Sequence, residues 1–349
     1  MNKESIFITG SLGSFGRVLT EELMKNYEFV NLLVRTKADS QPVDRVKTVF
    51  GDVAMHKIRV FQGDLREEDL GLSRTDYQYL TEETTHILHA AASTRFDLTI
   101  SEARDSNVKT VENILAFAEN CKQLKKLGFV STAFVAGKRK GVIHENELEH
   151  NDGFLNTYEE SKYEAEKIIQ SKKGKLPVVI FRPSLVATTF KGDDSNPINA
   201  VVLGLKLIRK GLLPILPGKD TDRLDIITAA NAATKISELF FKDRNSHDVY
   251  HIVSSLESPT VRDLINIALK TSNQKIQVKF CGDVVSFNEE VEKITKLNPD
   301  LAMVYQKVNS FMPELAFPKI FDDHNVLDEL GKDPNSLKNL KESIATAIT

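Results

Sequence analysis

Residues 5–25 read SIFITGSLGSFGRVLTEELMK, and the rest of the chain is organised around this stretch. It begins with Ser5–Thr9, a short apolar run typical of a buried strand, and its later apolar residues recur at helical spacing. Between the two, Gly10, Gly13 and Gly16 give the spacing G-x-x-G-x-x-G. A glycine turn between a strand and a helix cradles a dinucleotide pyrophosphate, because the backbone can approach the phosphates and the helix start supplies free N–H groups.

Glycine turns between a strand and a helix also occur where close packing alone requires them. The position of this turn, at the extreme N-terminus and opening a βα unit, favours cofactor binding. The residues expected to contact the cofactor here are Thr9, Gly10, Leu12, Gly13, Ser14, Phe15 and Gly16.

The composition is that of a soluble globular enzyme. The 349 residues are 41% hydrophobic and 27% charged, enough for two domains or for one large α/β domain with an elaboration. The net charge of −3 gives no reason to expect nucleic-acid binding. Two cysteines, Cys121 and Cys281, are too few for a disulfide framework or a metal site and fit a reducing cytosol. With no signal peptide and no apolar run near the ~20 residues of a membrane span, we expect a cytoplasmic protein.

Apolar runs alternate with helical patterns over the first 190 residues, and a late apolar run follows at Val249–Val253. This rhythm predicts an α/β fold, a Rossmann-type doubly wound parallel sheet. After the first run, the expected strands are Phe29–Val34, Ile58–Gln62, Ile87–Ala92, Leu127–Val130, Val178–Arg182 and Val249–Val253, with helices at Asn107–Asn120 and Thr157–Gln170.

The alternation breaks at Lys191, where a loop leads into an apolar helix over Ile198–Gly211. We therefore expect residues 1–255 to form an NADP-binding Rossmann domain, with 191–223 contributing to a lid over the substrate. Residues 256–349 are then a smaller C-terminal substrate-binding region. The other elements expected after the break are a strand at Leu224–Thr228 and helices at Asn231–Phe241, Val261–Thr271, Phe287–Leu297 and Leu327–Gly331.

The end of the second expected strand indicates which dinucleotide is bound. A carboxylate there would hold the ribose 2′-OH of NAD, whereas a cation accommodates the 2′-phosphate of NADP. Arg35 and Lys37 stand at this place, so the sequence favours NADP(H). Asp64 follows the next strand, where it either caps a helix or accepts a hydrogen bond from the adenine amino group. The small residues Ala90, Ala91 and Ala92 leave room for a flat cofactor or serve close helix–sheet packing.

Tyr158 and Lys162 carry the expected chemistry. Residues four apart share one face of a helix, so the phenol and the ammonium point the same way. A cation beside a phenol lowers its pKa and prepares it for proton transfer. Thr132, at an upstream strand end, can present a hydroxyl to the same substrate oxygen.

These motifs together resemble the extended short-chain dehydrogenase/reductase family, which combines T-G-x-x-G-x-x-G with Y-x-x-x-K and an upstream Ser or Thr. Three stretches resemble its fatty acyl-CoA reductase and thioester reductase branch: ILHAAASTRFD (87–97), VSTAFV (130–135) and NTYEESKYEAE (156–166). Sugar-nucleotide epimerases and dehydratases share the core motifs but usually carry Tyr-Gly where this chain has Ala136-Gly137.

The resemblance implies a role for each matching residue. Tyr158 would be the general acid, Lys162 would hold the nicotinamide ribose and tune Tyr158, Thr132 would polarise the substrate carbonyl, and Asn107 would support the proton relay. The resemblance also places Arg35 at the 2′-phosphate. The remaining cofactor contacts that it implies are Asp64 and Leu65 at the adenine, and Pro183, Ser184, Leu185 and Val186 at the nicotinamide.

The expected activity is NADPH-dependent reduction of an acyl thioester, delivered by coenzyme A or an acyl carrier protein, to an aldehyde and, with a second hydride, an alcohol. Three alternatives stay open: a sugar-nucleotide epimerase or dehydratase, a ketone or aldehyde reductase, and an NADP(H)-binding regulator without turnover. Ala230 departs from an Asp common in the family, and we expect a free-standing reductase without the appended domain of eukaryotic relatives. The family also implies a homodimer formed through the helix that carries Tyr158.

Overall fold

The computed structural model describes residues 4–37, 40–188, 197–270, 276–331, 340–342 and 344–345. The loop expected just before Pro197 lies outside these ranges. Within them, no helix is long and apolar enough to cross a membrane.

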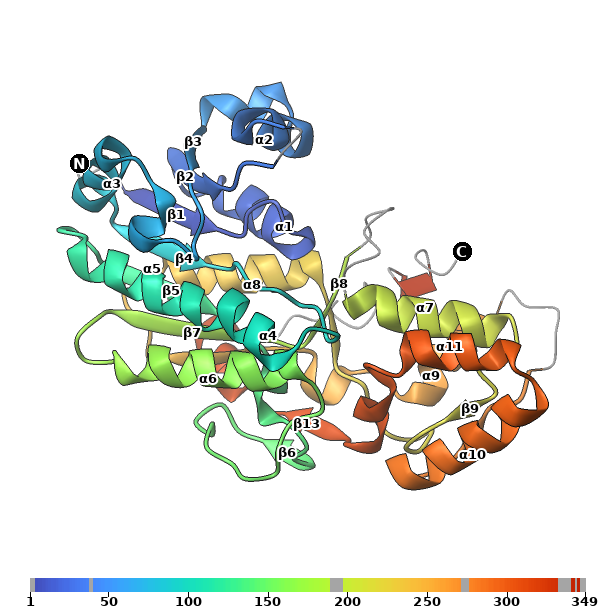
Figure 1. The fold of residues 1–349 in the computed structure, drawn as a ribbon. Coiled ribbons are helices and arrows are strands. Elements are labelled where there is room, and N and C mark those ends of the chain that lie inside the picture. The colour runs from blue at the N-terminus through green and yellow to red at the C-terminus, as the bar shows by residue number, and fades with distance from the viewer. Residues whose placement is uncertain are drawn as a thin grey trace.

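A seven-stranded, wholly parallel sheet forms the centre of the molecule, in the order β11-β7-β5-β4-β1-β2-β3 (Figure 1). The order reverses direction at β1 and β4, which is the Rossmann arrangement that the sequence predicts. The strands are β1 (Ser5–Thr9), β2 (Phe29–Val34), β3 (Ile58–Gln62), β4 (His86–His89), β5 (Lys126–Val130), β7 (Val178–Pro183) and β11 (Val249–Ile252).

Helices cover both faces of the sheet, so it is doubly wound. Each face buries a separate apolar cluster, in which helix residues at 3.6-residue spacing meet the strands. One face carries α1 (Ser14–Leu23), α2 (Pro42–Phe50), α8 (Ala229–Phe241) and α12 (His324–Leu330), and the other α3 (Arg74–Glu83), α5 (Lys109–Asn120) and α6 (Thr157–Ser171). Short 3-10 helices lie at η1 (Asp52–His56), η2 (Glu68–Gly71), η3 (Ala133–Ala136) and η4 (Ser255–Glu257).

Two predicted elements of the first half of the chain differ clearly in the structure. The expected strand over 87–92 ends at His89, so the alanines that follow lie beyond the sheet edge. The expected helix over 107–120 is α5, which begins at Lys109, and a separate helix that the sequence analysis did not assign, α4 (Ile100–Asn107), precedes it and is started by a capping box of Thr99 and Glu102.

The C-terminal half builds a smaller unit beside the sheet, on the right in Figure 1. We call it the lid. It has an apolar core of its own, made by residues of its helices and of β9. The lid comprises α7 (Pro197–Arg209), β9 (Ile215–Leu216), α9 (Val261–Leu269), β12 (Lys279–Phe280), α10 (Val284–Leu297), α11 (Asp300–Val308) and η5 (Met312–Ala316). The strand expected at 224–228 is shorter, β10 (Ile226–Thr228), and pairs with β8 (Leu185–Ala187) outside the main sheet.

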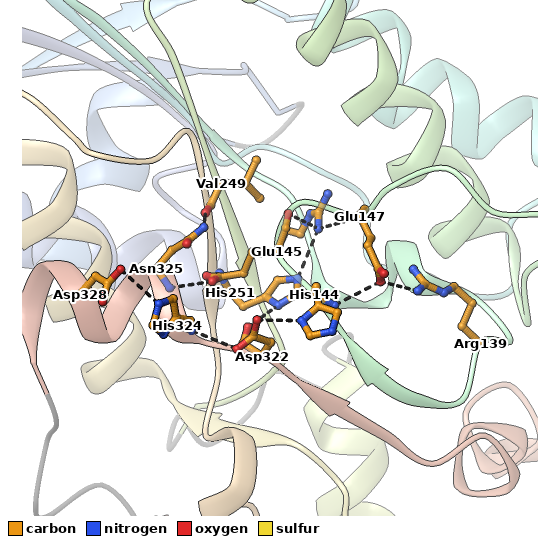
Figure 2. A network of polar contacts seen from close by, with 11 residues as sticks. Arg139, His144, Glu145, Glu147, Val249, His251, Asp322, His324, Asn325 and Asp328 are labelled. Atoms are coloured by element: carbon orange, nitrogen blue, oxygen red, sulfur yellow. Dashed lines mark hydrogen bonds and ion pairs between the residues drawn. The ribbon is translucent and has the colours of Figure 1, made fainter.

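After the lid the chain returns to the sheet, where β13 (Lys319–Phe321) pairs with β6 (Gly141–Ile143). A network of polar contacts holds the chain after the lid against the segment that follows β6 (Figure 2). The buried carboxylate of Glu145 accepts hydrogen bonds from the backbone N–H groups of His251 and Asn325, both at 2.7 Å. Residues far apart in sequence are thus held together behind the sheet.

Candidate active site

A cleft of about 890 Å³ runs from the carboxyl edge of the sheet into the lid. The edge where strand order reverses is where open α/β sheets bind ligands. Every predicted cofactor residue except Thr9 lines this cleft, as do the predicted catalytic residues except Asn107.

The glycine turn is packed backbone against backbone. Gly10 has a φ of +77°, and a Cβ on it would lie 2.6 Å from the backbone nitrogen of Ala91. A Cβ on Gly16 would lie 2.0 Å from the carbonyl oxygen of Gly10. Side chains are therefore excluded at both positions, and the backbone at the start of α1 is brought to the cleft. Ala90 and Ala91 lie directly against the backbone of Gly10, and all three alanines line the cleft.

Thr9 lies outside the described cleft lining and contacts the segment that packs on the glycine turn. Its buried hydroxyl is 2.8 Å from Nδ1 of His89 and accepts a hydrogen bond from the Ala91 N–H at 3.3 Å. The start of α1 has no side-chain cap among the described residues, which leaves its first N–H groups for a ligand. The turn thus fits a dinucleotide pyrophosphate.

Four basic side chains lie at the end of the cleft where the predicted adenosine contacts are. Arg35 and Lys37 are exposed there, as predicted, and Arg45 of α2 and Arg66 join them. Arg66 grips Asp64 with two guanidinium contacts, at 2.7 and 3.2 Å, which lowers the pKa of that carboxyl. The sequence analysis missed Arg45 because it assigned no helix at α2, although Pro at the first helical position signals one.

Thr132 and Tyr158 meet at the centre of the cleft. Thr132 follows β5 and caps η3, accepting a hydrogen bond from the Phe134 N–H at 3.3 Å. Tyr158 lies in the first turn of α6, which begins there because Asn156 caps the N–H of Glu159 at 3.0 Å. The hydroxyl of Thr132 donates to the Pro183 carbonyl oxygen at 3.4 Å and lies close enough to the Tyr158 phenol to act on its pKa.

The expectation that Lys162 lowers the pKa of Tyr158 was wrong for this structure. Burial raises the pKa of Tyr158 to about 12, against the opposing effect of the Thr132 hydroxyl. Lys162 directs its ammonium to the carbonyl oxygen of Val130 at 2.8 Å and lies over the Phe129 ring at 4.2 Å. Burial lowers the pKa of Lys162 to about 7. At neutral pH Tyr158 is therefore a protonated phenol, the form that can donate a proton.

The side chain of Asn107 is not among the residues that line the cleft; it hydrogen-bonds the segment after β4 and helix α6. Its amide oxygen accepts the Ser93 N–H at 2.7 Å, and its amide nitrogen donates to the Ser93 carbonyl at 3.1 Å and the Ser161 hydroxyl at 2.9 Å. These bonds join the segment after β4 to α6, the helix that carries Tyr158. The side chain positions the site and has its polar atoms already engaged.

The lid supplies an apolar wall to the far part of the cleft. The predicted nicotinamide contacts, residues 183–186, lie between this wall and the sheet edge. Sequence reasoning marked the helix at 198–211 but missed the contributions of α9 and η5. The apolar wall consists of Val201, Gly204, Leu205, Ile208, Leu264, Ile265, Phe311, Met312 and Leu315.

Two carboxyl groups that sequence reasoning missed, Glu159 and Glu314, also line the cleft. Cys121, by contrast, lies at the end of α5, where burial raises its pKa to about 12 and makes it a poor nucleophile. Within the described residues, no group of three or more His, Cys, Asp or Glu side chains could hold a metal ion.

The parallel doubly wound sheet, the glycine turn and the Tyr158–Lys162 pair together define an extended short-chain dehydrogenase/reductase. The chain belongs to the NAD-binding family described as male sterility protein, whose profile matches residues 8–236. A nicotinamide dinucleotide is therefore the class of cofactor.

Similar proteins include fatty acyl-CoA reductases. The chain is 28% identical over 268 residues to "Fatty acyl-CoA reductase wat" of Drosophila melanogaster, covering 64% of this chain and 51% of that protein. It is 28% identical over 323 residues to fatty acyl-CoA reductase 2 of Homo sapiens, covering 78% and 62%. The chain thus spans about half the length of the fly protein.

Solved structures agree on the fold. The terminal R domain of the myxalamid PKS-NRPS pathway superposes with a TM-score of 0.79 at 23% identity, over 100% of this chain and 90% of that one. A UDP-glucuronic acid 4-epimerase from Bacillus cereus superposes with a TM-score of 0.68 at 17% identity, over 99% and 96%. Because reductase and epimerase share the fold, function must be argued from the site.

Proposed function

We propose that the protein uses NADPH to reduce an acyl thioester. The observation that carries the proposal is the continuity of one cleft, from the glycine turn, past Tyr158 and Thr132, to the apolar wall. A nucleotide at one end and an acyl chain at the other would meet at the two hydroxyls. The similarity to proteins named fatty acyl-CoA reductases supports the same substrate class.

The choice of NADP over NAD rests on the adenosine end of the cleft. Four basic side chains line it, and Asp64 is already paired with Arg66. A 2′-phosphate would meet Arg35, Lys37 and Arg45, which is the charge pattern expected for NADP. Gly10, Gly13 and Gly16 would hold the pyrophosphate, and residues 183–186 the nicotinamide.

The reaction needs a proton donor and oxyanion stabilisation from the chain. NADPH, when bound, supplies the hydride that reduces the thioester carbonyl. Thr132 and Tyr158 direct hydroxyls to the carbonyl oxygen, and Tyr158, protonated at neutral pH, gives its proton to the developing oxyanion. The resulting hemithioacetal collapses to thiol and aldehyde. Lys162 holds its place through the Val130 carbonyl and is buried beside the reacting groups.

The apolar wall favours an acyl chain over a sugar. A sugar nucleotide needs many hydrogen-bond partners for its hydroxyls, whereas α7 and α9 present aliphatic side chains to the cleft. We further propose delivery by coenzyme A or an acyl carrier protein, a cytoplasmic location, and a homodimer formed through α6. The proposed division is a Rossmann domain over 1–255, with 191–223 in the lid, and a substrate-binding region over 256–349.

The test is NADPH consumption with a panel of acyl-CoAs, free aldehydes and sugar nucleotides. We expect oxidation that depends on acyl-CoA and releases thiol. NADPH oxidation with aldehydes or ketones alone would agree with a reductase but would exclude the thioester as its substrate. Conversion of a sugar nucleotide without NADPH consumption would replace the proposal with an epimerase.

A further inference from the structure

Residues 93–98, which we call the strap, bring a phenylalanine side chain to Tyr158. The strap lies between β4 and α4 and forms neither helix nor strand. Its Phe96 lines the cleft, and the Phe96 ring meets the Tyr158 ring edge-on, with centroids 5.7 Å apart and an interplanar angle of 61°. Aromatic pairs favour this edge-to-face arrangement. The proton donor of the proposed reaction therefore has an aromatic ring packed against it.

Helix α6 holds the strap at both ends. At one end, the hydroxyl of Thr157 donates to the Leu98 carbonyl oxygen at 2.9 Å. At the other end, the Asn107 amide bonds both the N–H and the carbonyl oxygen of Ser93, at 2.7 and 3.1 Å, and donates to the Ser161 hydroxyl at 2.9 Å. Residues 157 and 161 are about one turn apart on α6. Both ends of the strap are therefore tied to a single turn of this helix.

Tyr158 belongs to the same turn, which is the first of α6. On the strap, Arg95 and Asp97 stand on either side of Phe96 and form an ion pair with two contacts, at 3.0 and 2.8 Å. Both side chains are exposed, and an exposed ion pair contributes little to the stability of a fold. The effect of this pair is therefore local, on the conformation of the strap around Phe96.

Core packing does not account for the position of Phe96. The side chain is half-buried and lines the cleft. Within the part of the chain that the structure describes, Phe96 belongs to none of the four apolar clusters that make up the core of the sheet domain and of the lid. Its ring is therefore placed at the cleft, against the tyrosine, and not in the core.

A tyrosine that donates a proton needs its ring held from the side. A misplacement of about 1 Å in a reacting group can cost about a hundredfold in rate. The phenol of Tyr158 turns about two side-chain bonds, and its hydroxyl must stay available to the substrate oxygen. A second ring packed against the tyrosine ring restricts this rotation without occupying the hydroxyl. The contact with Phe96 meets that requirement.

We propose that Phe96 positions the phenol of Tyr158 for proton donation, and that the strap is the device by which α6 holds Phe96 in place. The inference rests on the proposed function for one point, the role of Tyr158 as proton donor. Phe96 acts through Tyr158 and is a positioning residue. The bonds of Asn107 gain a purpose in this arrangement, because they fix the start of the strap.

The primary test is Phe96→Ala, assayed with an acyl-CoA and NADPH. We expect kcat to fall by about tenfold to a hundredfold, because the phenol is no longer held in place, with KM for NADPH little changed. Phe96→Tyr keeps the ring and should restore the wild-type kcat. Thr157→Val keeps the shape of the side chain and removes the hydroxyl that donates to Leu98, so it should lower kcat by a smaller factor.

The matched control is Phe154→Ala. Phe154 packs on Tyr163, another tyrosine of α6, with ring centroids 5.0 Å apart, and neither residue is part of the described cleft lining. The variant removes the same side chain from the same kind of pair on the same helix. It should leave kcat and KM at their wild-type values, whatever its effect on the melting temperature.

Nitration of the tyrosines by tetranitromethane tests the contact without turnover. The reagent attacks accessible phenolates, and burial raises the pKa of Tyr158 to about 12, so Tyr158 should react slowly in the wild type. In Phe96→Ala, nitration should be several times faster at Tyr158 and unchanged at Tyr163, and Phe154→Ala should show the reverse. Trypsin cuts after Lys162, so mass spectrometry reads the two tyrosines in separate peptides.

Two results would overturn the inference: equal nitration of Tyr158 in the wild type and Phe96→Ala, or a Phe96→Ala enzyme with the wild-type kcat. A wild-type kcat in Thr157→Val would overturn the role given to the strap. A wild-type protein that consumes no NADPH with any carbonyl substrate would instead refute the proposed function. The nitration comparison would still decide whether Phe96 holds and shields Tyr158.

Discussion

If the cleft holds an acyl chain as proposed, Gly204 sets part of the space for it. It lies inside α7, is buried and belongs to the apolar wall. A Cβ there would meet the terminal methyl of Met312 at 3.4 Å and the Phe311 ring at 3.8 Å. Glycine inside a helix costs about 0.5–1 kcal/mol relative to alanine, so the helix gives up stability at a position where a side chain would enter the cleft beside Met312 and Phe311.

We predict that Gly204→Leu shortens the accepted acyl chain. The leucine side chain would occupy the space of about three methylenes, each of which contributes about 0.8 kcal/mol when buried. A loss of about 2.4 kcal/mol corresponds to an approximately 50-fold fall in kcat/KM for long chains. Chains that end before Gly204 should react as with the wild type. Gly204→Ala should be milder and should stabilise the fold by up to about 1 kcal/mol.

The assay is kcat/KM for a series of saturated acyl-CoAs of increasing length. Lys206→Leu is the control, since Lys206 lies on the exposed side of the same helix and should leave the profile unchanged. A break in the length profile confined to Gly204→Leu supports the reasoning. An equal fall for all lengths, or an unchanged profile, would refute it.

The remaining predictions concern the adenosine end and the buried charges. Arg45→Ser should raise KM for NADPH about tenfold and leave KM for NADH unchanged, because it removes one contact to the 2′-phosphate. The control Lys47→Ser changes a residue outside the described cleft lining and should alter neither KM value. Burial raises the pKa of Glu145 to about 7, so the stability that its protonated form contributes is complete below the unfolded pKa and is lost as pH rises through 7. Between pH 5 and 8 the free energy of unfolding of the wild type should therefore fall by up to about 3 kcal/mol more than that of Glu145→Gln. Denaturant titration at each pH measures this difference. Arg182→Met should lower the free energy of unfolding by about 3–5 kcal/mol, because it leaves the fully buried Glu166 carboxylate unpaired, and equal urea midpoints would contradict this.

The sheet and its glycine turn could be predicted because their signals are local. A parallel strand buried on both faces reads as a largely apolar run, and Phe29–Val34 was assigned with its observed bounds. The edge strand Ile58–Gln62 was also assigned with its observed bounds, although Arg59 and Gln62 are exposed. The turn at Gly10 and the pair four residues apart on α6 are read from spacing alone. These two local patterns were enough to predict the glycine turn and the Tyr158–Lys162 pair.

The parts that were missed depend on tertiary contact. Glu314 joins the cleft lining because η5 of the lid folds toward the sheet edge, and no spacing in the sequence records that approach. The pKa of Tyr158 was assigned the wrong direction because the helix face shows the lysine but not the degree of burial. Asn107 was placed in the relay by analogy, whereas its hydrogen bonds commit it to Ser93 and Ser161.

The measurement that tests the central claim most directly is thiol release per NADPH consumed, with a long-chain acyl-CoA, for the wild type and Tyr158→Phe. The account predicts one thiol for each NADPH consumed by the wild type if reduction stops at the aldehyde, and one for every two if it continues to the alcohol. In Tyr158→Phe, which keeps the ring and loses the proton, it predicts a fall of about 10²-fold or more in rate. A Tyr158→Phe enzyme with the wild-type rate, or NADPH consumption without thiol release, would contradict it.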